Sequence, residues 1–270
     1  MHYDPIKQFL SRVFNRYAFT RKLFYFLLDV LLLRSWHIRR ALKSYRLSNQ
    51  TKKQLHVLDA GSGLGQYSWR MARKNPSWKI TAVDIKEDEI ASCRAFFKQQ
   101  KVNNVDFLTA NLTNYKKPDT YDLVLSVDVM EHIENDMQVF KNFNTSLKEG
   151  GVLLISTPSD LGGSDVKEEG DSSFIEEHVR DGYAAEEIKN KLSDAGFQKV
   201  ATSYTYGKPG SLAWRISMKY PVLMLGRARV LILFLPLYYL LVMPFVLVLN
   251  YLDLINNHKK GTGLLVKAWK

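Results

Sequence analysis

The sequence is poor in cysteine and has no recognisable export signal. Cys93 is the single thiol among 270 residues, which excludes a disulfide within the chain and is typical of a reducing compartment. Near the N-terminus, Asp29 and several arginines interrupt the apolar stretch FYFLLDVLLL, so it lacks the continuous apolar core of a secretory signal. Internal repeats are also missing. We therefore expect a cytoplasmic protein made of one large domain, or of one domain with an elaboration.

Acidic residues are scarce at both ends of the chain. The formal net charge is +11, but residues 51–206 hold twenty-four acids against nineteen lysines and arginines. Residues 1–50 carry ten basic residues against two acids, and residues 207–260 carry seven against one. Both basic segments are also rich in Leu, Phe and Tyr. Basic residues mixed with apolar ones favour an anionic membrane surface as the partner over nucleic acid.

The middle of the chain alternates between short apolar runs and helical stretches. The runs predict strands at 55–60, 78–84, 105–110, 121–127, 150–157, 197–207 and 261–270. Helices are expected at 65–75, 87–101, 135–150 and 184–197. The strands lack polar alternation, as expected when both faces of a sheet are covered. The pattern predicts an α/β fold with a largely parallel sheet and helices on both faces.

A glycine-rich turn, VLDAGSGLG, follows the first expected strand. Gly61, Gly63 and Gly65 allow the backbone to turn tightly and to approach a ligand without an intervening Cβ. The spacing is G-x-G-x-G, so the third glycine of a dinucleotide fingerprint is absent. Asp59 lies two residues before the first glycine and places a carboxylate where it can face a cation. The alternative is a tight turn without any ligand.

Asp84 ends the second expected strand, in the stretch ITAVDI. A carboxylate at the carboxyl edge of such a sheet can accept hydrogen bonds from both hydroxyls of a ribose. Its position about twenty residues after the glycines supports a nucleoside site.

These motifs resemble those of the class I S-adenosylmethionine-dependent methyltransferases. VLDAGSGLG, AVDI, YDLVLSVDVMEHI and LKEGGVLLISTP follow one another as in that family, and the resemblance covers Leu55–Val200 plus the last ten residues. It implies a Rossmann-like sheet of seven strands whose last strand is antiparallel, and S-adenosyl-L-methionine as the cofactor. Asn111 stands where the family commonly has an acidic residue near the adenine. The resemblance assigns cofactor contacts to Asp59, Gly61, Ser62, Gly63, Gly65, Asp84, Ile85, Asn111, Leu112, Ser126 and Val127.

The stretch SVDVMEHI resembles the ubiquinone-biosynthesis O-methyltransferases and related small-molecule enzymes. Asp128, Glu131 and His132 cluster here. His132 is a candidate general base that removes a hydroxyl proton. Alternatively, Asp128 and Glu131 hold a divalent ion that orients the acceptor, or Glu131 and His132 only order the wall of the site. We take His132 and Asp128 as catalytic candidates without a metal.

A second catalytic candidate, His178, closes the acidic and glycine-rich stretch from Pro158 to His178, which reads as a solvated loop or a mobile lid. His178 and Arg180 precede a helix that faces the acceptor in related enzymes. They are expected to act as a base or a substrate clamp, or else to form a linker in which Arg180 pairs with a nearby acid.

The longest uncharged run, VLILFLPLYYLLVMPFVLVLN, lies in an insertion between the last two expected strands. By length it could cross a bilayer, but a single crossing would separate the last strand from the sheet. We therefore expect a helical hairpin that dips into one leaflet or covers an acceptor channel, with helices broken near Pro236 and Pro244. The predicted organisation is a basic amphipathic helical extension over 1–50, the methyltransferase core over 51–207, the insertion over 208–260, and the final core strand over 261–270.

The function expected from these features is methyl transfer from S-adenosylmethionine to a hydrophobic small-molecule or lipid-like acceptor. O-methylation is the first choice and C-methylation the second, at the inner face of the cell membrane with the protein peripheral or monotopic. The alternatives are an RNA methyltransferase that uses the basic ends, and a non-catalytic cofactor-binding subunit of a membrane biosynthetic complex.

Overall fold

A computed structural model describes residues 18–162 and 179–270, apart from residue 228. Its centre is a mixed sheet of seven strands in the order β3-β2-β1-β4-β5-β7-β6, which confirms the expected fold class. β7 alone runs antiparallel to its neighbours, between β5 and β6. The strands are β1 (His56–Ala60), β2 (Lys79–Asp84), β3 (Val105–Thr109), β4 (Tyr121–Val127), β5 (Leu147–Pro158), β6 (Lys199–Thr205) and β7 (Gly263–Trp269).

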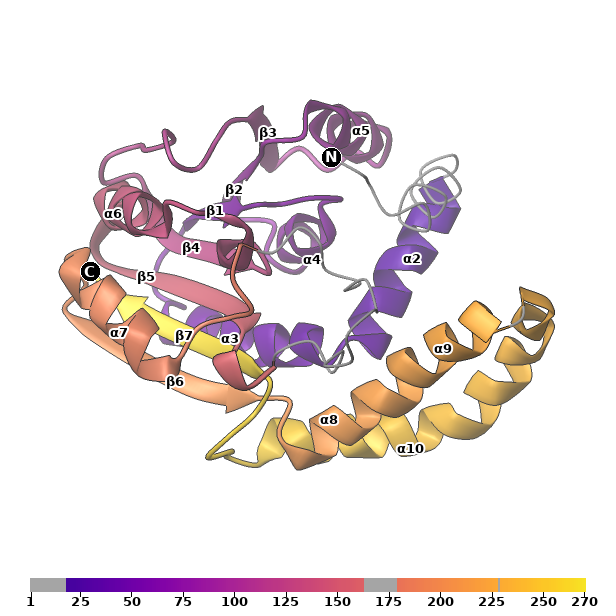
Figure 1. Ribbon diagram of the computed structural model, residues 1–270. Helices are drawn as coiled ribbons and strands as arrows, with labels where there is room; N and C mark the ends of the chain where they lie inside the picture. Colours follow the sequence, from indigo (N-terminus) through magenta and orange to yellow (C-terminus); the bar gives the residue numbers. More distant parts are fainter. Residues whose placement is uncertain (1–17, 163–178, 228) are drawn as a thin grey trace.

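Helices cover both faces of the sheet (Figure 1). Successive residues of a strand face opposite sides, so Val57 of β1 packs on one face and Leu58 on the other. α6 (Asp136–Ser146) and α7 (Ala185–Asp194) supply side chains to the core that contains Leu58, and α3 (Leu33–Ser48) and α4 (Gln66–Lys74) supply the core that contains Val57. α2 (Ala18–Leu31) and α5 (Glu87–Gln99) close a third cluster against β2 and β3.

The expected insertion between β6 and β7 is a long helical hairpin (Figure 1). Its outgoing leg consists of α8 (Lys208–Trp214), a π-helical turn (Arg215–Lys219) and α9 (Tyr220–Arg227). A short 3-10 segment (Arg229–Phe234) leads into α10 (Leu235–Ile255), which returns to the sheet. Because Thr205 pairs with Gly263, both ends of the hairpin leave the sheet at one point, the carboxyl edge of the parallel strands.

One helical segment among the described residues, Ile232–Ile255, has the length and composition of a membrane span, and very little of it is buried. Pro236 lies in the first turn of α10, where its missing N–H costs no hydrogen bond. Pro244 does not break the helix, and in this respect the prediction was wrong. Contacts hold α10 on both sides of Pro244, since the hydroxyls of Tyr238 and Tyr239 donate to carbonyls of the outgoing leg and Val246 is buried.

The helix expected over 135–150 ends earlier than predicted. α6 stops at Ser146, and β5 begins at Leu147, which pairs with Tyr121. Leu147 is fully buried, and Lys148 reaches Asp122 at 2.8 Å. These tertiary contacts override the helical pattern of LKEG, and the cost is a register irregularity between β4 and β5.

Candidate active site at the carboxyl edge of the sheet

The glycine turn after β1 has a backbone that only glycine adopts easily. Gly61, Gly63 and Gly65 all have positive φ angles, of 78°, 48° and 78°. A Cβ built on Gly61 would lie 2.2 Å from Cγ2 of Val129, which follows β4. The turn therefore brings the backbone close to the end of β4 and leaves a surface without side chains, as a ligand cradle requires.

Asp84 joins this turn to the end of β2. Its Oδ2 accepts a hydrogen bond from the Gly63 N–H at 2.7 Å, and its Oδ1 accepts one from the Lys86 N–H at 3.0 Å. The carboxylate is half-buried, so it keeps lone pairs that point outward. The next residue, Ile85, is 64% exposed and offers an apolar surface beside the carboxylate. This pairing suits a nucleoside, whose ribose is polar and whose base is flat and apolar.

Asp59 is buried beneath the turn rather than exposed at its surface. Its Oδ2 accepts a hydrogen bond from the Ser68 hydroxyl at 2.5 Å. Burial raises the pKa of Asp59 to about 6, and the nearby Asp84 carboxylate adds to the shift while the bond from Ser68 opposes it. An added positive charge at the turn would stabilise the ionised form of Asp59.

Asn111 and Leu112 follow β3 on the same edge. Oδ1 of Asn111 accepts from the N–H and hydroxyl of Thr113, at 2.9 and 2.8 Å, which fixes a turn of the kind that asparagine favours. Leu112 is buried, and Asn142 donates to its carbonyl oxygen at 2.9 Å. Asn111 itself is exposed and orders this loop through its bonds to Thr113.

Two serine hydroxyls provide a test of whether a cofactor fits this edge. The Oγ atoms of Ser62 and Ser126 are buried and find no hydrogen-bond partner among the described residues. Ser62 lies inside the glycine turn, and Ser126 is the second-to-last residue of β4. Buried polar groups are normally paired, so orphans at this edge indicate a ligand or water that completes them. The site residues thus fit a polar cofactor that lies across β1, β2 and β4.

Asp128, just beyond β4, has a φ of 52°, an uncommon conformation for a residue other than glycine. Its N–H donates to Ser156 O at 2.8 Å, and its carboxylate forms an ion pair with Arg34 of α3. The Arg34 N–H in turn donates to the hydroxyl of Tyr206 at 3.1 Å, at the root of the hairpin. A cluster of Arg34, Asp128 and Tyr206 therefore connects the N-terminal helices, the sheet edge and the insertion.

Glu131 and His132 follow in the short 3-10 turn Met130–His132 and differ in exposure. Glu131 is buried and accepts a hydrogen bond from the Thr157 hydroxyl at 3.0 Å, whereas His132 is exposed. Burial raises the pKa of Glu131 to about 8, with the charge of Asp128 as the second cause. Glu131 is thus mostly protonated at neutral pH. No group of three metal-ligating side chains occurs in the described part of the chain.

The raised pKa of Glu131 predicts a pH dependence of stability. An unfolded chain loses the Glu131 proton near pH 4.5, but the folded protein keeps it until about pH 8. The folded state therefore holds the extra proton between these values, and stability falls as pH rises across them, by on the order of a few kcal/mol. Glu131→Gln should flatten the profile of unfolding free energy between pH 5 and pH 9, as measured by urea denaturation.

The control for this prediction is Glu134→Gln, which removes an exposed carboxyl three residues away. It should leave the pH profile of the wild type unchanged. A Glu131→Gln profile that keeps the slope of the wild type would contradict the burial argument.

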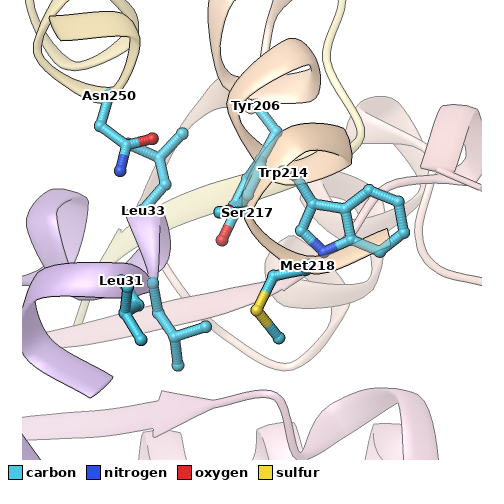
Figure 2. Close-up of a pocket in the computed structure, with 8 residues that line it drawn as sticks. Leu31, Leu33, Tyr206, Trp214, Ser217, Met218 and Asn250 are labelled. Carbon is cyan, nitrogen blue, oxygen red and sulfur yellow. The ribbon is translucent and has the colours of Figure 1, made fainter. Parts of the chain in front are cut away.

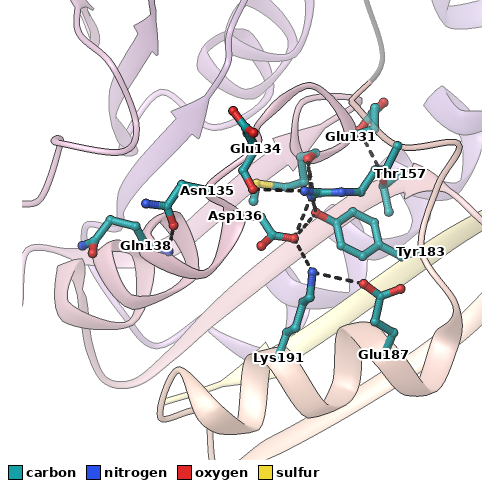
Figure 3. Close-up of polar contacts among 11 residues, drawn as sticks. Glu131, Glu134, Asn135, Asp136, Gln138, Thr157, Tyr183, Glu187 and Lys191 are labelled. Atoms are coloured by element: carbon teal, nitrogen blue, oxygen red, sulfur yellow. Dashed lines mark hydrogen bonds and ion pairs between the residues drawn. The ribbon is translucent and has the colours of Figure 1, made fainter.

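Arg180 belongs to a structural network rather than to an open acceptor site. Its guanidinium contacts Asp136 at 2.7 Å and the hydroxyl of Tyr183, and Lys191 reaches the same Asp136 carboxylate at 2.8 Å (Figure 3). Tyr183 is fully buried and donates to Asp136 at 2.7 Å. Arg180 therefore pairs with Asp136, a partner from a different part of the chain. His178 lies outside the described residues.

Side chains of α2 form hydrogen bonds with the backbone of the glycine turn. The buried Arg21 donates to Leu64 O at 2.8 Å, to the Tyr25 hydroxyl at 2.7 Å and to Ser92 Oγ at 2.9 Å. A buried arginine that satisfies several backbone and hydroxyl acceptors holds a helix in one place. The described part of the N-terminal extension is thus integrated with the glycine turn. Its first 17 residues lie outside the described range.

A narrow apolar crevice separates the α2–α3 junction from the hairpin (Figure 2). Leu31, Leu33, Trp214 and Met218 line it, and its volume of about 10 Å³ is room for one water molecule. Asn250 of α10 is 1% exposed and lines the crevice with an Nδ2 that lacks a partner among the described residues. Tyr206 borders the crevice as well, so the crevice adjoins the Arg34 cluster.

Sequence reasoning missed Arg21, Arg34 and Tyr206. Each lies in a segment without a local motif, and each meets its partner only through the fold. One sequence feature pointed weakly to these arginines. In the N-terminal extension they fall between apolar residues, and a helix bound to a membrane would expose those apolar residues.

Comparison with known proteins identifies the family. Residues 51–202 match a family described as a methyltransferase domain. The ubiquinone biosynthesis O-methyltransferase of Rickettsia canadensis is 30% identical over 104 residues, which cover 38% of this chain and 43% of that protein. The (S)-coclaurine N-methyltransferase of Thalictrum flavum is 29% identical over 106 residues, which cover 39% and 29%. The chain thus spans less than half the length of these curated relatives.

The fold also matches solved structures. Phosphoethanolamine N-methyltransferase 2 of Haemonchus contortus, solved in complex with S-adenosyl-L-methionine, aligns with a TM-score of 0.60 at 19% identity. The alignment covers 92% of this chain and 60% of that protein. At this identity the likeness concerns the fold alone.

Proposed function

The chain belongs to the S-adenosylmethionine-dependent methyltransferases, and from that premise we propose that it methylates a hydrophobic, lipid-like acceptor at the inner face of the cell membrane. The observation that carries the proposal is the exposed apolar face of α10. That helix returns to the sheet at the edge that holds the cofactor site (Figure 1).

The exposed face of α10 runs along its whole length. Its large apolar side chains recur every three or four residues, which places them in one stripe. The opposite face packs on the outgoing leg of the hairpin through Tyr238, Tyr239 and Val246. A stripe of this size on a soluble surface marks an interaction site. The stripe consists of Leu237, Leu240, Leu241, Phe245, Val248, Leu252 and Ile255.

A membrane fits this stripe better than RNA does. The stripe carries no charge, and α2 adds exposed Phe19, Leu23 and Phe26 on one helical face. RNA binding needs cations that follow the phosphate backbone. A helix that presents a continuous apolar side lies in the interface plane, with its polar neighbours at the headgroups. This supports a monotopic arrangement of the hairpin along the membrane.

S-adenosylmethionine supplies an activated methyl group, so the protein mainly has to position the two reactants. In this proposal, Asp84 holds the ribose, the glycine turn leaves room for the amino-acid portion, and Ser62 and Ser126 complete polar contacts. The ion pair between Arg34 and Asp128 closes the site on the acceptor side.

The relatives include both O- and N-methyltransferases. The chemistry of the acceptor therefore determines which atom is methylated. O-methylation remains our first choice because of SVDVMEHI, and a hydroxyl acceptor needs a base. His132 fits that role because it is exposed and follows the end of β4, four residues after Asp128. The deciding experiment incubates the protein with labelled S-adenosylmethionine and either membrane lipid extract or RNA. Label in the organic phase supports the proposal, and label in RNA alone refutes it.

The apolar stripe predicts a loss of membrane binding in the variant Leu240→Gln, Phe245→Gln. These side chains are 72% and 70% exposed, so their substitution leaves the core intact. Each large apolar side chain contributes about 1.5–3 kcal/mol when it leaves water. Affinity for phosphatidylcholine vesicles should therefore fall at least tenfold in a flotation assay.

The matched control is Leu47→Gln, Leu108→Gln, which changes two exposed leucines outside the hairpin. It should float as the wild type does. Equal loss in both variants would indicate general stickiness and would remove the stripe as the membrane contact.

A further inference from the structure

The indole ring of Trp69, on α4, carries two cations. Nζ of Lys22 from α2 lies 5.9 Å from the ring centre, and the guanidinium carbon of Arg73 lies 5.1 Å from it. The same ring packs against the buried Phe96 and Phe97 of α5, at 5.0 and 5.5 Å between ring centres. Trp69 is half-buried, whereas Lys22 and Arg73 are exposed. The core therefore fixes the ring, and the ring holds two positive charges at the surface.

These two charges are not neutralised within the described part of the chain. Lys22 and Arg73 form no ion pair there, and Trp69 is the partner that the structure gives each of them. The helices α2, α3 and α4 together hold ten lysines and arginines and one acid, Asp29. Asp29 forms an ion pair with Arg70, so its charge is already compensated. The described helices beside Trp69 thus carry a net positive charge.

A second pair of a cation and a tryptophan lies on α3. The guanidinium carbon of Arg39 is 5.2 Å from the ring centre of Trp36. Burial lowers the pKa of Arg39, and the charge of Arg70 on α4 lowers it further, while Asp29 opposes the shift. Arg39 and Arg70 are therefore close enough to repel each other. A surface on which cations crowd in this way attracts an anionic partner.

The outer side of α2 is apolar beside these charges. Phe19, Leu23 and Phe26 are 74%, 40% and 62% exposed. Their spacing of four and three residues places them on one helical face, and Lys22 falls on the same face, three residues after Phe19 and four before Phe26. A lysine in this setting covers apolar surface with its stem and reaches outward with its charge. Nucleic acid would make poor use of Leu23, since bases stack on aromatic rings, whereas a bilayer accepts both the apolar and the cationic groups.

We propose that Lys22 and Arg73, held over Trp69, bind the phosphate groups of anionic membrane lipids while Phe19 and Phe26 enter the apolar layer. This surface gives the protein a preference for anionic membranes, which the uncharged stripe of α10 cannot give. The inference rests on the proposed function, because it requires α2 to meet a membrane.

The same helix joins this surface to the glycine turn. Arg21, the neighbour of Lys22, points inward and donates to Leu64 O at 2.8 Å. Tyr25 also bonds to Leu64 O, and its ring lies 6.2 Å from that of Trp69. Lipid contact on the outer side of α2 therefore fixes the position of the glycine turn relative to the membrane.

The test compares vesicles of phosphatidylglycerol with vesicles of phosphatidylcholine in a flotation assay on the full chain. The wild type should bind the anionic vesicles more tightly. The variant Lys22→Gln, Arg73→Gln should lose on the order of thirtyfold in affinity for phosphatidylglycerol, because each cation near an anionic surface contributes about 1 kcal/mol, a factor of about five. Its affinity for phosphatidylcholine should not change, because the apolar contacts are intact, and this result also shows that the variant folds.

The chain offers a matched control in a second tryptophan with two cations. Lys199 and Lys267 place their Nζ atoms 5.2 and 5.6 Å from the ring centre of Trp269. Trp269 ends β7, which lies four strand spacings from β2 in the sheet, roughly 19 Å and beyond a Debye length. The variant Lys199→Gln, Lys267→Gln should keep its affinity for phosphatidylglycerol within about threefold. Equal losses in the two double variants would overturn the proposal, because they would reflect net charge alone.

A labelled single-stranded RNA tests the other kind of polyanion by fluorescence anisotropy at physiological salt. The wild type and the variant Lys22→Gln, Arg73→Gln should bind it equally weakly. RNA affinity that the variant loses while it keeps its affinity for phosphatidylglycerol would assign this surface to RNA and overturn the proposal. A wild type that floats with phosphatidylcholine without preferring phosphatidylglycerol would overturn this inference alone, whereas a wild type that floats with neither would contradict the proposed function.

Discussion

Replacing Asp84 with alanine is expected to lower the affinity for S-adenosylmethionine at least a hundredfold in a protein that still folds. The carboxylate holds the Gly63 N–H at 2.7 Å and the Lys86 N–H at 3.0 Å, so it shapes the glycine turn as well as the proposed ribose contact. A hydrogen bond to a charged group contributes about 1.5–3 kcal/mol, and the ribose offers two hydroxyls. Losing both corresponds to a factor of about 10² to 10⁴, which isothermal calorimetry resolves.

Asp88→Ala is the matched control, because it removes the same side chain from an exposed position in the first turn of α5. Its effect through the helix dipole is about 0.3–1 kcal/mol and concerns stability rather than binding. Thermal unfolding of Asp84→Ala should stay close to that of the wild type, since Asp84 is only half-buried. Cofactor affinity within threefold of the wild type would remove Asp84 as the ribose ligand.

The sheet and the glycine turn were predictable because their signals are local. Apolar runs such as VLDA and LVLSV are buried on both faces of a parallel sheet, and the structure places every such run in a strand. The turn needs positive φ at Gly61, Gly63 and Gly65, and glycine itself signals that need. The fold class therefore followed from patterns that span fewer than ten residues.

The acceptor side was not predictable in the same way. Arg34 meets Asp128 across 94 residues of sequence, and it meets Tyr206 across 172. Neither spacing carries a local pattern, so no motif distinguishes Arg34 from the other arginines of the extension. Two of the three catalytic candidates, Asp128 and His132, came from the local motif SVDVMEHI, in which Glu131 is buried and His132 exposed.

Tertiary contacts also explain the errors in element boundaries. Pro244 predicts a break by its missing N–H, yet α10 continues because Tyr238, Tyr239 and Val246 hold both halves against the outgoing leg. Local propensity is a weak prior where such packing acts. These same contacts hold α10 against the outgoing leg, so its exposed apolar side chains gather on the opposite face.

Asp253→Ala is expected to destabilise the protein by about 3–5 kcal/mol, because it leaves several buried donors without an acceptor and each costs about 1–3 kcal/mol. The buried carboxylate forms hydrogen bonds with His37 at 3.0 Å, the Tyr206 N–H at 3.2 Å and the Gly210 N–H at 3.1 Å, and His258 lies 3.1 Å from it while bonding to the Asp253 backbone carbonyl. It thus fastens α10 to α3 and to both ends of the hairpin. Thermal unfolding should begin about 10 °C lower, and limited proteolysis should cut the hairpin first.

The contrast with two other variants isolates this role. Asp194→Ala removes an exposed carboxyl and should shift unfolding by less than about 0.5 kcal/mol. Asp253→Asn keeps an oxygen acceptor of the same shape and should lose less than the alanine variant. If Asp253→Ala unfolded within two degrees of the wild type, the hairpin would be held by its apolar packing alone. The membrane contact proposed for α10 would then be mechanically independent of the sheet edge, since no polar anchor would connect the two.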